Sequence, residues 1–259
     1  MAMLDLGWGS PPAGPRATGD EVHVWRASLQ QPKGVLEEFA RTLAPAEREQ
    51  AARFRFPVHR DRFIAGRGIQ RAILGRYLGE APGALRFRSG TRGKPELDGL
   101  EGASGIRFNV SNAEDLALYA VTLGREVGVD LEPLHRVLDA QGLAKSFFSS
   151  TECDALGKVS DALIHAAFLN GWTRKEALIK AVGDGLSMPL DAFDVTLTPG
   201  EPARLLATRT PGLDANRWTL HALDAGPQWV AAIAVEGDGW TARGFDWDGG
   251  LAPSHTPAD

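Results

Sequence analysis

Two long stretches of helical periodicity, each followed by several strand patterns, constrain the fold of this 259-residue chain most strongly. In the first half, the spacing of apolar residues predicts helices over 34–54 and 58–79 and strands over 85–89, 106–110 and 116–123. In the second half it predicts a strand over 126–132, helices over 139–146, 150–156 and 160–182, and strands over 192–198, 217–223, 228–235 and 240–246. The sequence therefore predicts a mixed α/β (α+β) fold in two parts, each with a long helix and several strands.

The predicted strand over 126–132 carries two carboxylates on one face. Alternation places Val127, Val129 and Leu131 on one side of the strand, and Asp130 and Glu132 together on the other. Neighbouring like charges raise each other's protonation cost unless a cation or a hydrogen-bond network compensates. The pattern indicates a metal or a basic partner. The alternative is an edge strand whose two acids are simply solvated.

The segment Trp172–Lys180 places further charged groups on a helix. We expect helical spacing to bring Lys175 and Glu176 to one side, with Lys180 one turn beyond Glu176. Glu176 and Lys180 also have the spacing of an ordinary i,i+4 ion pair, which stabilises a helix by about 0.2–0.5 kcal/mol.

Taken together, the two segments supply what a metal bound to a pyrophosphate needs. Asp130, Glu132 and Glu176 offer the hard oxygen ligands that Mg²⁺ prefers, and Mn²⁺ is an alternative. The lysines would balance phosphate charge. We therefore predict a magnesium site formed by these three carboxylates.

Composition agrees with a soluble enzyme rather than a nucleic-acid or membrane protein. The formal charge is −5, and no apolar run is long enough to span a membrane. The single cysteine, Cys153, excludes an intrachain disulfide and fits a reducing compartment. The first twenty residues lack the basic and apolar regions of a signal peptide. We expect a cytoplasmic protein that is a monomer.

Positive charge is concentrated in one segment of this acidic chain. Between Arg41 and Arg76 there are nine arginines and three acids. Guanidinium groups bind phosphate through paired hydrogen bonds, so the segment suits a polyanionic ligand. The alternative is a solvated helix whose arginines only keep the protein soluble.

The ordered series of motifs resembles one family, the 4'-phosphopantetheinyl transferase superfamily of the Sfp type. The resemblance covers roughly residues 41–198, and the series is far more specific than any single motif. It rests on the segments Gly128–Glu132, Phe147–Glu152, Trp172–Lys180 with the following Ala181–Leu186, Arg92–Pro95, Phe108–Ser111 and an arginine-rich helix around Arg62.

The resemblance implies two similar α/β subdomains related by pseudo-twofold symmetry, with the active site in the cleft between them. We expect an N-terminal subdomain over 21–124 on the side of the coenzyme A nucleotide and a C-terminal subdomain over 125–248 with the metal and catalytic motifs. Residues 1–20 and 249–259 are expected to be disordered tails.

The implied reaction transfers 4'-phosphopantetheine from coenzyme A to a serine hydroxyl of an acyl or peptidyl carrier protein and releases 3',5'-ADP. The carrier would belong to fatty acid, polyketide or nonribosomal peptide synthesis. Glu176 would be the general base, with Glu132 as the alternative. Lys180 would stabilise the pyrophosphate or leaving group, and Lys175 would hold another phosphate oxygen.

Coenzyme A contacts are carried over from the family motifs onto matching positions. The predicted binding residues are Arg62, Lys94, Pro95, Ser111, Asn112, Asp130, Lys175 and Lys180, with Arg53 and Arg71 as weaker candidates. One position departs from the family. Where a histidine usually contacts the 3'-phosphate of coenzyme A, this chain has Asn112, which can donate a hydrogen bond but carries no charge.

Two other functions use the same residues. A Mg²⁺-dependent pyrophosphate hydrolase would use the three carboxylates to activate water instead of serine. A coenzyme A binding protein without activity would explain Asn112. The retained charged residues argue against this second alternative, because a site without activity has no physical need to keep like charges together.

Overall fold

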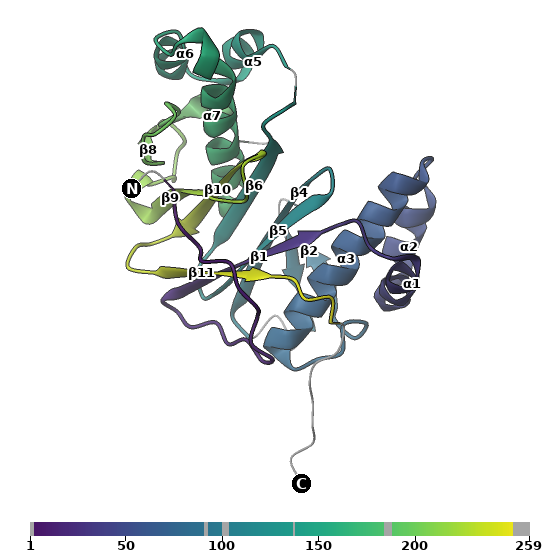
Figure 1. Cartoon of the computed structure of the whole chain (residues 1–259). Helices are drawn as coiled ribbons and strands as arrows, with labels where there is room; N and C mark the ends of the chain where they lie inside the picture. The colour runs from purple at the N-terminus through teal and green to yellow at the C-terminus, as the bar shows by residue number, and fades with distance from the viewer. Residues whose placement is uncertain (1–2, 91–92, 100–103, 137, 184–187, 251–259) are drawn as a thin grey trace.

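The computed structural model describes residues 3–90, 93–99, 104–136, 138–183 and 188–250. It shows two long helices that pack on antiparallel strands (Figure 1). The first half contains β1 (Glu21–Ser28), α1 (Lys33–Thr42), α2 (Pro45–Ala52), α3 (Pro57–Leu78), β2 (Phe87–Ser89), β3 (Pro95–Leu97), β4 (Ile106–Ala113) and β5 (Leu116–Leu123). The predicted helix over 34–54 is in fact two helices, because Pro45 begins α2 and the preceding backbone is extended.

The second half also contains a long helix, shorter helices and several strands. It contains β6 (Val127–Pro133), α5 (Ala140–Phe147), α6 (Ser150–Leu156), α7 (Asp161–Val182), β7 (Phe193–Val195), β8 (Leu205–Thr208), β9 (Trp218–Leu223), β10 (Trp229–Glu236) and β11 (Thr241–Asp246). Short 3₁₀ turns at Leu190–Ala192 and Ala215–Arg217 precede β7 and β9. None of the helices in the described ranges has the length and apolar character needed to cross a membrane.

The two halves share one strand order. The first sheet contains the order β1-β5-β4, and the second sheet has the order β6-β10-β9. In each half a helix of 22 residues follows the first strand, and a two-stranded hairpin, β2-β3 or β7-β8, follows that helix. Both helices end at a glycine in the left-handed region, Gly79 (φ 68°) and Gly183 (φ 80°). The mixed α/β fold expected from the sequence is confirmed, with two halves of similar topology.

The halves meet where β4 lies beside β6. The Asn109 side chain on β4 accepts a hydrogen bond from the Val129 backbone N–H on β6, at 2.9 Å. Helix α7 lies unusually close to β6 because residue 128 is glycine: a Cβ there would stand 2.0 Å from the Ala177 carbonyl oxygen. Any larger side chain at Gly128 would push the helix away from the strand. The close contact brings the charged residues of α7 next to those of β6.

Two predicted boundaries are wrong. Strand β11, which we assigned to the C-terminal part, pairs in parallel with β1 and so completes the first sheet. Residues 3–20, expected to be a disordered tail, make ordered contacts with both sheets. Leu6 is buried, and bridges join Leu4 to Leu223 and Gly9 to Phe245. Apolar burial thus fixes a segment that its glycines and prolines suggested would be mobile. The predicted C-terminal tail lies largely outside the described residues.

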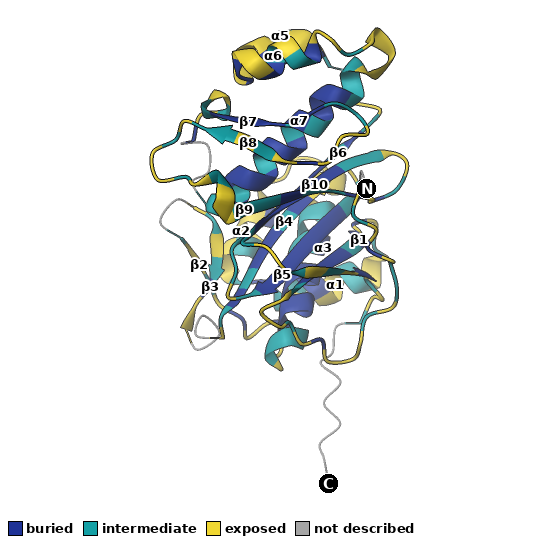
Figure 2. Ribbon diagram, turned by 90° about the vertical axis from the view of Figure 1, so that its left-hand side faces the viewer, coloured by how far each residue is buried: buried dark blue, intermediate teal, exposed yellow. Residues whose placement is uncertain are grey.

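Burial follows the sheets and the inner sides of the long helices (Figure 2). One apolar cluster, including Trp25, Phe39 and Ile69, packs α3 against the first sheet. A second, including Val24, Leu118 and Val129, joins the two sheets at their junction. The junction is therefore a continuous part of the core, which holds the residues on either side of it in place.

Candidate active site

Asp130 lies at the junction of the two halves and is tied to a lysine and a serine. Its side chain is on β6 and only 5% of the residue is exposed. Lys180 Nζ on α7 lies 2.7 Å from Asp130 Oδ1, and Ser111 Oγ on β4 donates to the same oxygen at 2.9 Å. Lys180 also donates to Ser111 Oγ at 3.0 Å. The three side chains come from three elements and form one cluster, so Asp130 is not a solvated acid on an edge strand.

Glu176 is electrostatically coupled to this cluster. Burial raises the pKa of the Glu176 carboxyl, the charges of Asp130 and Glu132 raise the pKa further, and Lys180 opposes them. The Lys180 ammonium forms its ion pair with Asp130 on the neighbouring strand β6, rather than with Glu176 along the helix. Glu132 is held by Arg136, whose Nη1 donates to Glu132 Oε2 at 2.8 Å.

The donor set suits a hard divalent cation. Asp130 Oδ2 is buried and has no hydrogen-bond partner among the described residues, so this oxygen is available to coordinate a cation. Burial is the first cause of the raised pKa of Glu176, and the neighbouring carboxylates of Asp130 and Glu132 add to it. Across the described ranges, no three acidic, histidine or cysteine side chains are arranged as a closed metal site.

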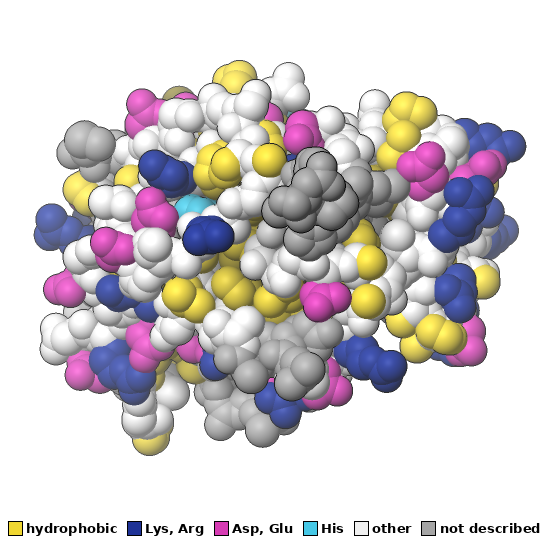
Figure 3. Space-filling view, turned by 90° about the horizontal axis from the view of Figure 1, so that it is seen from below, with side chains coloured by type: hydrophobic (Ala, Val, Ile, Leu, Met, Phe, Trp, Pro, Cys, Tyr) yellow, Lys and Arg dark blue, Asp and Glu magenta, His cyan; other side chains and the backbone are white. Residues whose placement is uncertain are grey.

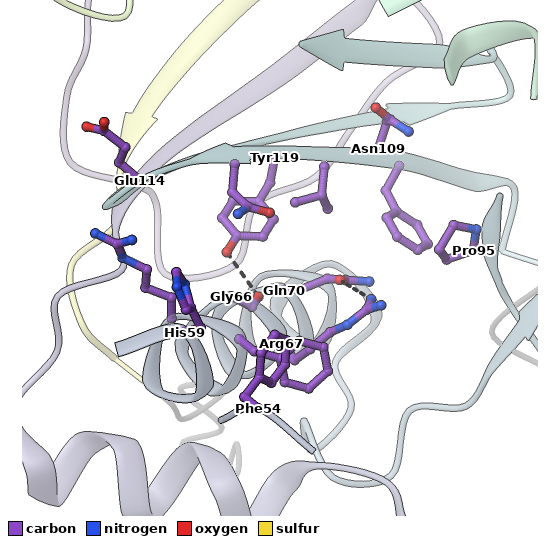
Figure 4. A pocket seen from close by; sticks show the side chains of 14 residues that line it. Phe54, His59, Gly66, Arg67, Gln70, Pro95, Asn109, Glu114 and Tyr119 are labelled. Atoms are coloured by element: carbon purple, nitrogen blue, oxygen red, sulfur yellow. Dashed lines mark hydrogen bonds between the residues drawn. The ribbon is translucent and has the colours of Figure 1, made fainter. Parts of the chain in front are cut away.

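Two adjoining cavities lie at or near the cluster. One, of about 610 Å³, is lined by Ser111, Asp130, Glu132 and Lys180. The other, of about 530 Å³, lies between α3 and the sheet and is lined by Arg62 and Pro95 (Figure 4). Asn112 and Glu114 line both cavities. We call them the carboxylate cavity and the helix cavity. Together they offer room for an extended ligand.

The helix cavity combines positive charge with aromatic surface. His59, Arg62 and Arg67 line it from α3, and Phe108 and Tyr119 line it from the sheet. Arg62 Nε donates to Asp115 Oδ1 at 2.7 Å, which fixes the guanidinium at the cavity edge. Figure 3 shows several Lys and Arg side chains at the right-hand edge of the molecule, on the side where Figure 1 places α1 and α2. The basic segment therefore borders the cavity.

The prediction that Lys175 holds a phosphate oxygen is wrong in this structure. Lys175 is 0% exposed, and its Nζ lies 2.7 Å from Glu152 Oε2. The same ammonium donates to the carbonyl oxygens of Leu190 and Phe193, both at 2.6 Å. Residues i and i+1 of a helix do not face the same side, so Lys175 points to β7 while Glu176 is coupled to Asp130. Lys175 thus fixes α7 to the hairpin below it.

Glu152 has a structural role. It forms a capping box with Ser149, whose backbone N–H donates to Glu152 Oε2 at 3.0 Å. Its other oxygen accepts from the Val195 N–H at 2.8 Å. Burial lowers the pKa of Lys175 and the Glu152 charge opposes that change. The two residues form a fully buried ion pair with satisfied hydrogen bonds.

We expect Lys175→Met to lower the free energy of unfolding by about 3–5 kcal/mol, because Glu152 would keep a buried charge without a partner. The double variant Lys175→Met, Glu152→Gln should recover part of this loss, since no charge is then left alone. Urea unfolding followed by circular dichroism measures both. A double variant less stable than Lys175→Met would contradict the role of the pair.

Two other residues that we predicted to contact coenzyme A form hydrogen bonds and ion pairs within the protein instead. Lys94 Nζ donates to Glu126, at 2.8 Å, and to the carbonyl oxygens of Val127 and Ala181, so it links the two halves. Arg71 is buried and pairs with Glu47 at 2.7 Å. Both were chosen by motif or by charge alone, and tertiary packing gives them structural contacts instead. Arg53 is exposed and lines neither cavity. Arg92 lies outside the described residues.

Three polar residues of α3 that line the helix cavity were not predicted from the sequence: His59, Arg67 and Gln70. They line the helix cavity together with Arg62 and Gly66. The signal was present, because positions 59, 62, 66 and 70 follow the spacing of one helix face. Only the sheet packed opposite shows that this face borders a cavity.

Two family models together match most of the chain. A model of the 4'-phosphopantetheinyl transferase superfamily matches residues 126–234. A second model, of the N-terminal part of 4'-phosphopantetheinyl transferase, matches residues 24–123. The two matches meet between β5 and β6, where the topology of the first half begins again.

Curated relatives agree with these matches. The 4'-phosphopantetheinyl transferase HetI of Nostoc sp. is 43% identical over 93% of this chain and 98% of its own length. The 4'-phosphopantetheinyl transferase Sfp of Bacillus subtilis is 32% identical over 62% of this chain and 69% of its own. Among solved structures, a Bacillus anthracis holo-(acyl-carrier-protein) synthase in complex with CoA (3',5'-ADP) aligns over 44% of this chain and 96% of its own chain. The sequence identity is 18% and the TM-score is 0.33. On the sequence matches, the chain belongs to the 4'-phosphopantetheinyl transferase superfamily.

Proposed function

We propose that this protein transfers the 4'-phosphopantetheine arm of coenzyme A to a serine hydroxyl of an acyl or peptidyl carrier protein and releases 3',5'-ADP. The observation that carries the proposal is the cluster of Asp130, Lys180 and Ser111 beside the coupled carboxyl of Glu176. It lies at one end of two adjoining cavities, in a chain whose relatives are transferases of this kind.

The cavities divide the substrate in a way that fits its chemistry. The carboxylate cavity would take the pyrophosphate, and the helix cavity, with Arg62 and Pro95 on its wall, would take the nucleotide. Asn112 lines both and could donate a hydrogen bond to a phosphate, without charge. One chain supplies every residue of the site, so a monomer suffices.

Asp130, Glu132 and Glu176 would hold Mg²⁺ or Mn²⁺, with Asp130 Oδ2 as the ligand atom that has no other partner among the described residues. When bound, the ion neutralises charge that grows on the pyrophosphate. In the same cluster Lys180 supplies a fixed positive charge, held by Ser111 and Asp130.

The reaction step balances as a phosphoryl substitution. The serine oxygen attacks the phosphorus that carries the pantetheine arm, and the bond from that phosphorus to the bridging oxygen breaks. Glu176 accepts the serine proton, a role favoured by its raised pKa, and Glu132 is the alternative base. The bridging oxygen leaves with 3',5'-ADP, and Lys180 balances its charge.

The setting of the reaction is also part of the proposal. Cys153 is a free cysteine, which fits a reducing compartment such as the cytoplasm. The acceptor would be a carrier of fatty acid, polyketide or nonribosomal peptide synthesis. Carrier proteins are commonly acidic, and the exposed arginines of α2 and the start of α3 would attract such a partner.

Release of 3',5'-ADP, measured by chromatography, should depend on both an apo carrier protein and the metal. We expect release with coenzyme A, Mg²⁺ and apo carrier, none when the carrier is already modified, and none after treatment with EDTA. Adding Mg²⁺ in excess of EDTA should restore it. Release at the same rate without any carrier would instead identify a pyrophosphate hydrolase.

A further inference from the structure

Gln70 places an unpaired hydrogen-bond donor in the wall of the helix cavity. Its side chain is on α3, and 3% of the residue is exposed. Its amide nitrogen, Nε2, has no hydrogen-bond partner anywhere in the described part of the chain. Gln70 is nevertheless one of the residues that line the cavity. A buried polar atom without a partner, on a residue that lines a cavity, is accounted for most simply by a ligand that occupies the cavity.

Arg67 determines which way the Gln70 amide faces. Arg67 Nη1 donates to Gln70 Oε1 at 3.0 Å, one turn along the helix, as the dashed line in Figure 4 shows. The opposite amide orientation would place two donors against each other, so the nitrogen must point away from Arg67. Arg67 itself is oriented by Glu47, whose carboxylate lies 3.9 Å from Arg67 Nε. The amide nitrogen is therefore held as a pure donor.

The neighbouring side chains named below offer no acceptor to the Gln70 amide nitrogen. Tyr119 uses its hydroxyl to donate to the Gly66 carbonyl at 3.0 Å, and Phe63 and Phe108 present apolar surface. In the free protein this donor is buried without a partner among the described residues, which costs about 1–3 kcal/mol, and an acceptor on a bound ligand would remove that cost. The site thus selects a group with an acceptor at this position.

We propose that Gln70, oriented by Arg67, determines nucleotide specificity by donating from Nε2 to a hydrogen-bond acceptor in the 3',5'-ADP half of coenzyme A. This inference rests on the proposed function, because it assigns the helix cavity to the nucleotide. The acceptor is either the 3'-phosphate or an acceptor in the adenosine 5'-phosphate part. Arg67 adds positive charge beside the donor, which compensates in part for the uncharged Asn112 elsewhere on the cavity wall.

Calorimetric titration of the full chain with 3',5'-ADP and with 5'-AMP, in the presence of Mg²⁺, tests this proposal. Gln70→Met keeps the size of the side chain but removes the donor, and we expect 3',5'-ADP to bind about three- to tenfold more weakly. Gln70→Glu keeps the acceptor for Arg67 and replaces the donor with a carboxylate oxygen. We expect it to weaken binding by at least about tenfold. Gln228→Met, at an exposed position, is the matched control, and melting curves check the fold of each variant.

Each outcome of the titration has a definite meaning. A loss for 3',5'-ADP alone supports the proposal and identifies the 3'-phosphate as the acceptor. An equal loss for both nucleotides supports it with an acceptor in the shared adenosine 5'-phosphate. Unchanged affinity of folded Gln70→Met and Gln70→Glu for both nucleotides, while the unaltered chain binds them, overturns the inference alone. Failure of the unaltered chain to bind 3',5'-ADP or coenzyme A would count against the proposed function itself.

Discussion

Glu176→Gln is expected to lower kcat for transfer by about 10²- to 10⁴-fold, the range that a positioned general base contributes. The substitution keeps the size of the side chain and one oxygen for a metal, but an amide cannot accept the serine proton. Burial and the charges of Asp130 and Glu132 raise the pKa of Glu176, and a bound divalent cation would lower it; in either case the unaltered enzyme should gain activity with rising pH as this carboxyl loses its proton. The variant should lack that rise.

Initial rates with saturating coenzyme A and apo carrier, measured across pH, give both kcat and its dependence on pH. Glu38→Gln is the matched control, because Glu38 is exposed on α1 and lies outside both cavities. A Glu176→Gln enzyme that keeps near-normal turnover would remove Glu176 as the base. The same pair of experiments on Glu132→Gln would then test the alternative base.

Lys180→Met is expected to lower kcat by about 10²- to 10³-fold, the loss seen when one fixed group that stabilises transition-state charge is removed. Lys180 is the only described lysine in the wall of the carboxylate cavity, where it lies 2.7 Å from Asp130. Its charge would meet the negative charge that grows on the leaving 3',5'-ADP. Lys180→Arg keeps the charge and should recover part of the rate.

Single-turnover rates separate this effect from product release. Lys158→Met, at an exposed position after α6, controls for the loss of a lysine elsewhere. Because Asp130 would lose its partner, melting curves must show that Lys180→Met is folded under the assay conditions. Undiminished turnover in a folded Lys180→Met variant would exclude Lys180 from catalysis.

The sequence predicted the long helices and most strands because their apolar periodicity is strong. It did not predict β1, whose residues His23, Val24 and Trp25 are all buried. A strand covered on both faces shows no alternation, so the periodic signal is absent. The place of β11 could not be read from the sequence either. Its pairing with β1 joins residues more than two hundred positions apart, and no local pattern specifies that contact.

The charged cluster was predictable to the extent that motifs and helix geometry determine it. Asp130, Ser111 and Lys180 do converge, as the ordered motifs implied. Lys175 was misassigned because neighbouring positions on a helix face different ways, and only the packing of α7 on β7 shows which side borders the cavity. Gln70 gave no chemical signal at all in the sequence. Its unpaired amide becomes visible only when Arg67 and the cavity are placed around it.

The intact mass of an apo carrier protein after incubation with this protein, coenzyme A and Mg²⁺ tests the central claim most directly. The account predicts that the carrier gains the mass of one phosphopantetheine group, and that a carrier whose acceptor serine is replaced by alanine gains none. Carriers from a fatty acid synthase and from a peptide synthase should both be tried. No gain with any carrier, under conditions in which the protein binds coenzyme A, would contradict the proposed transferase activity.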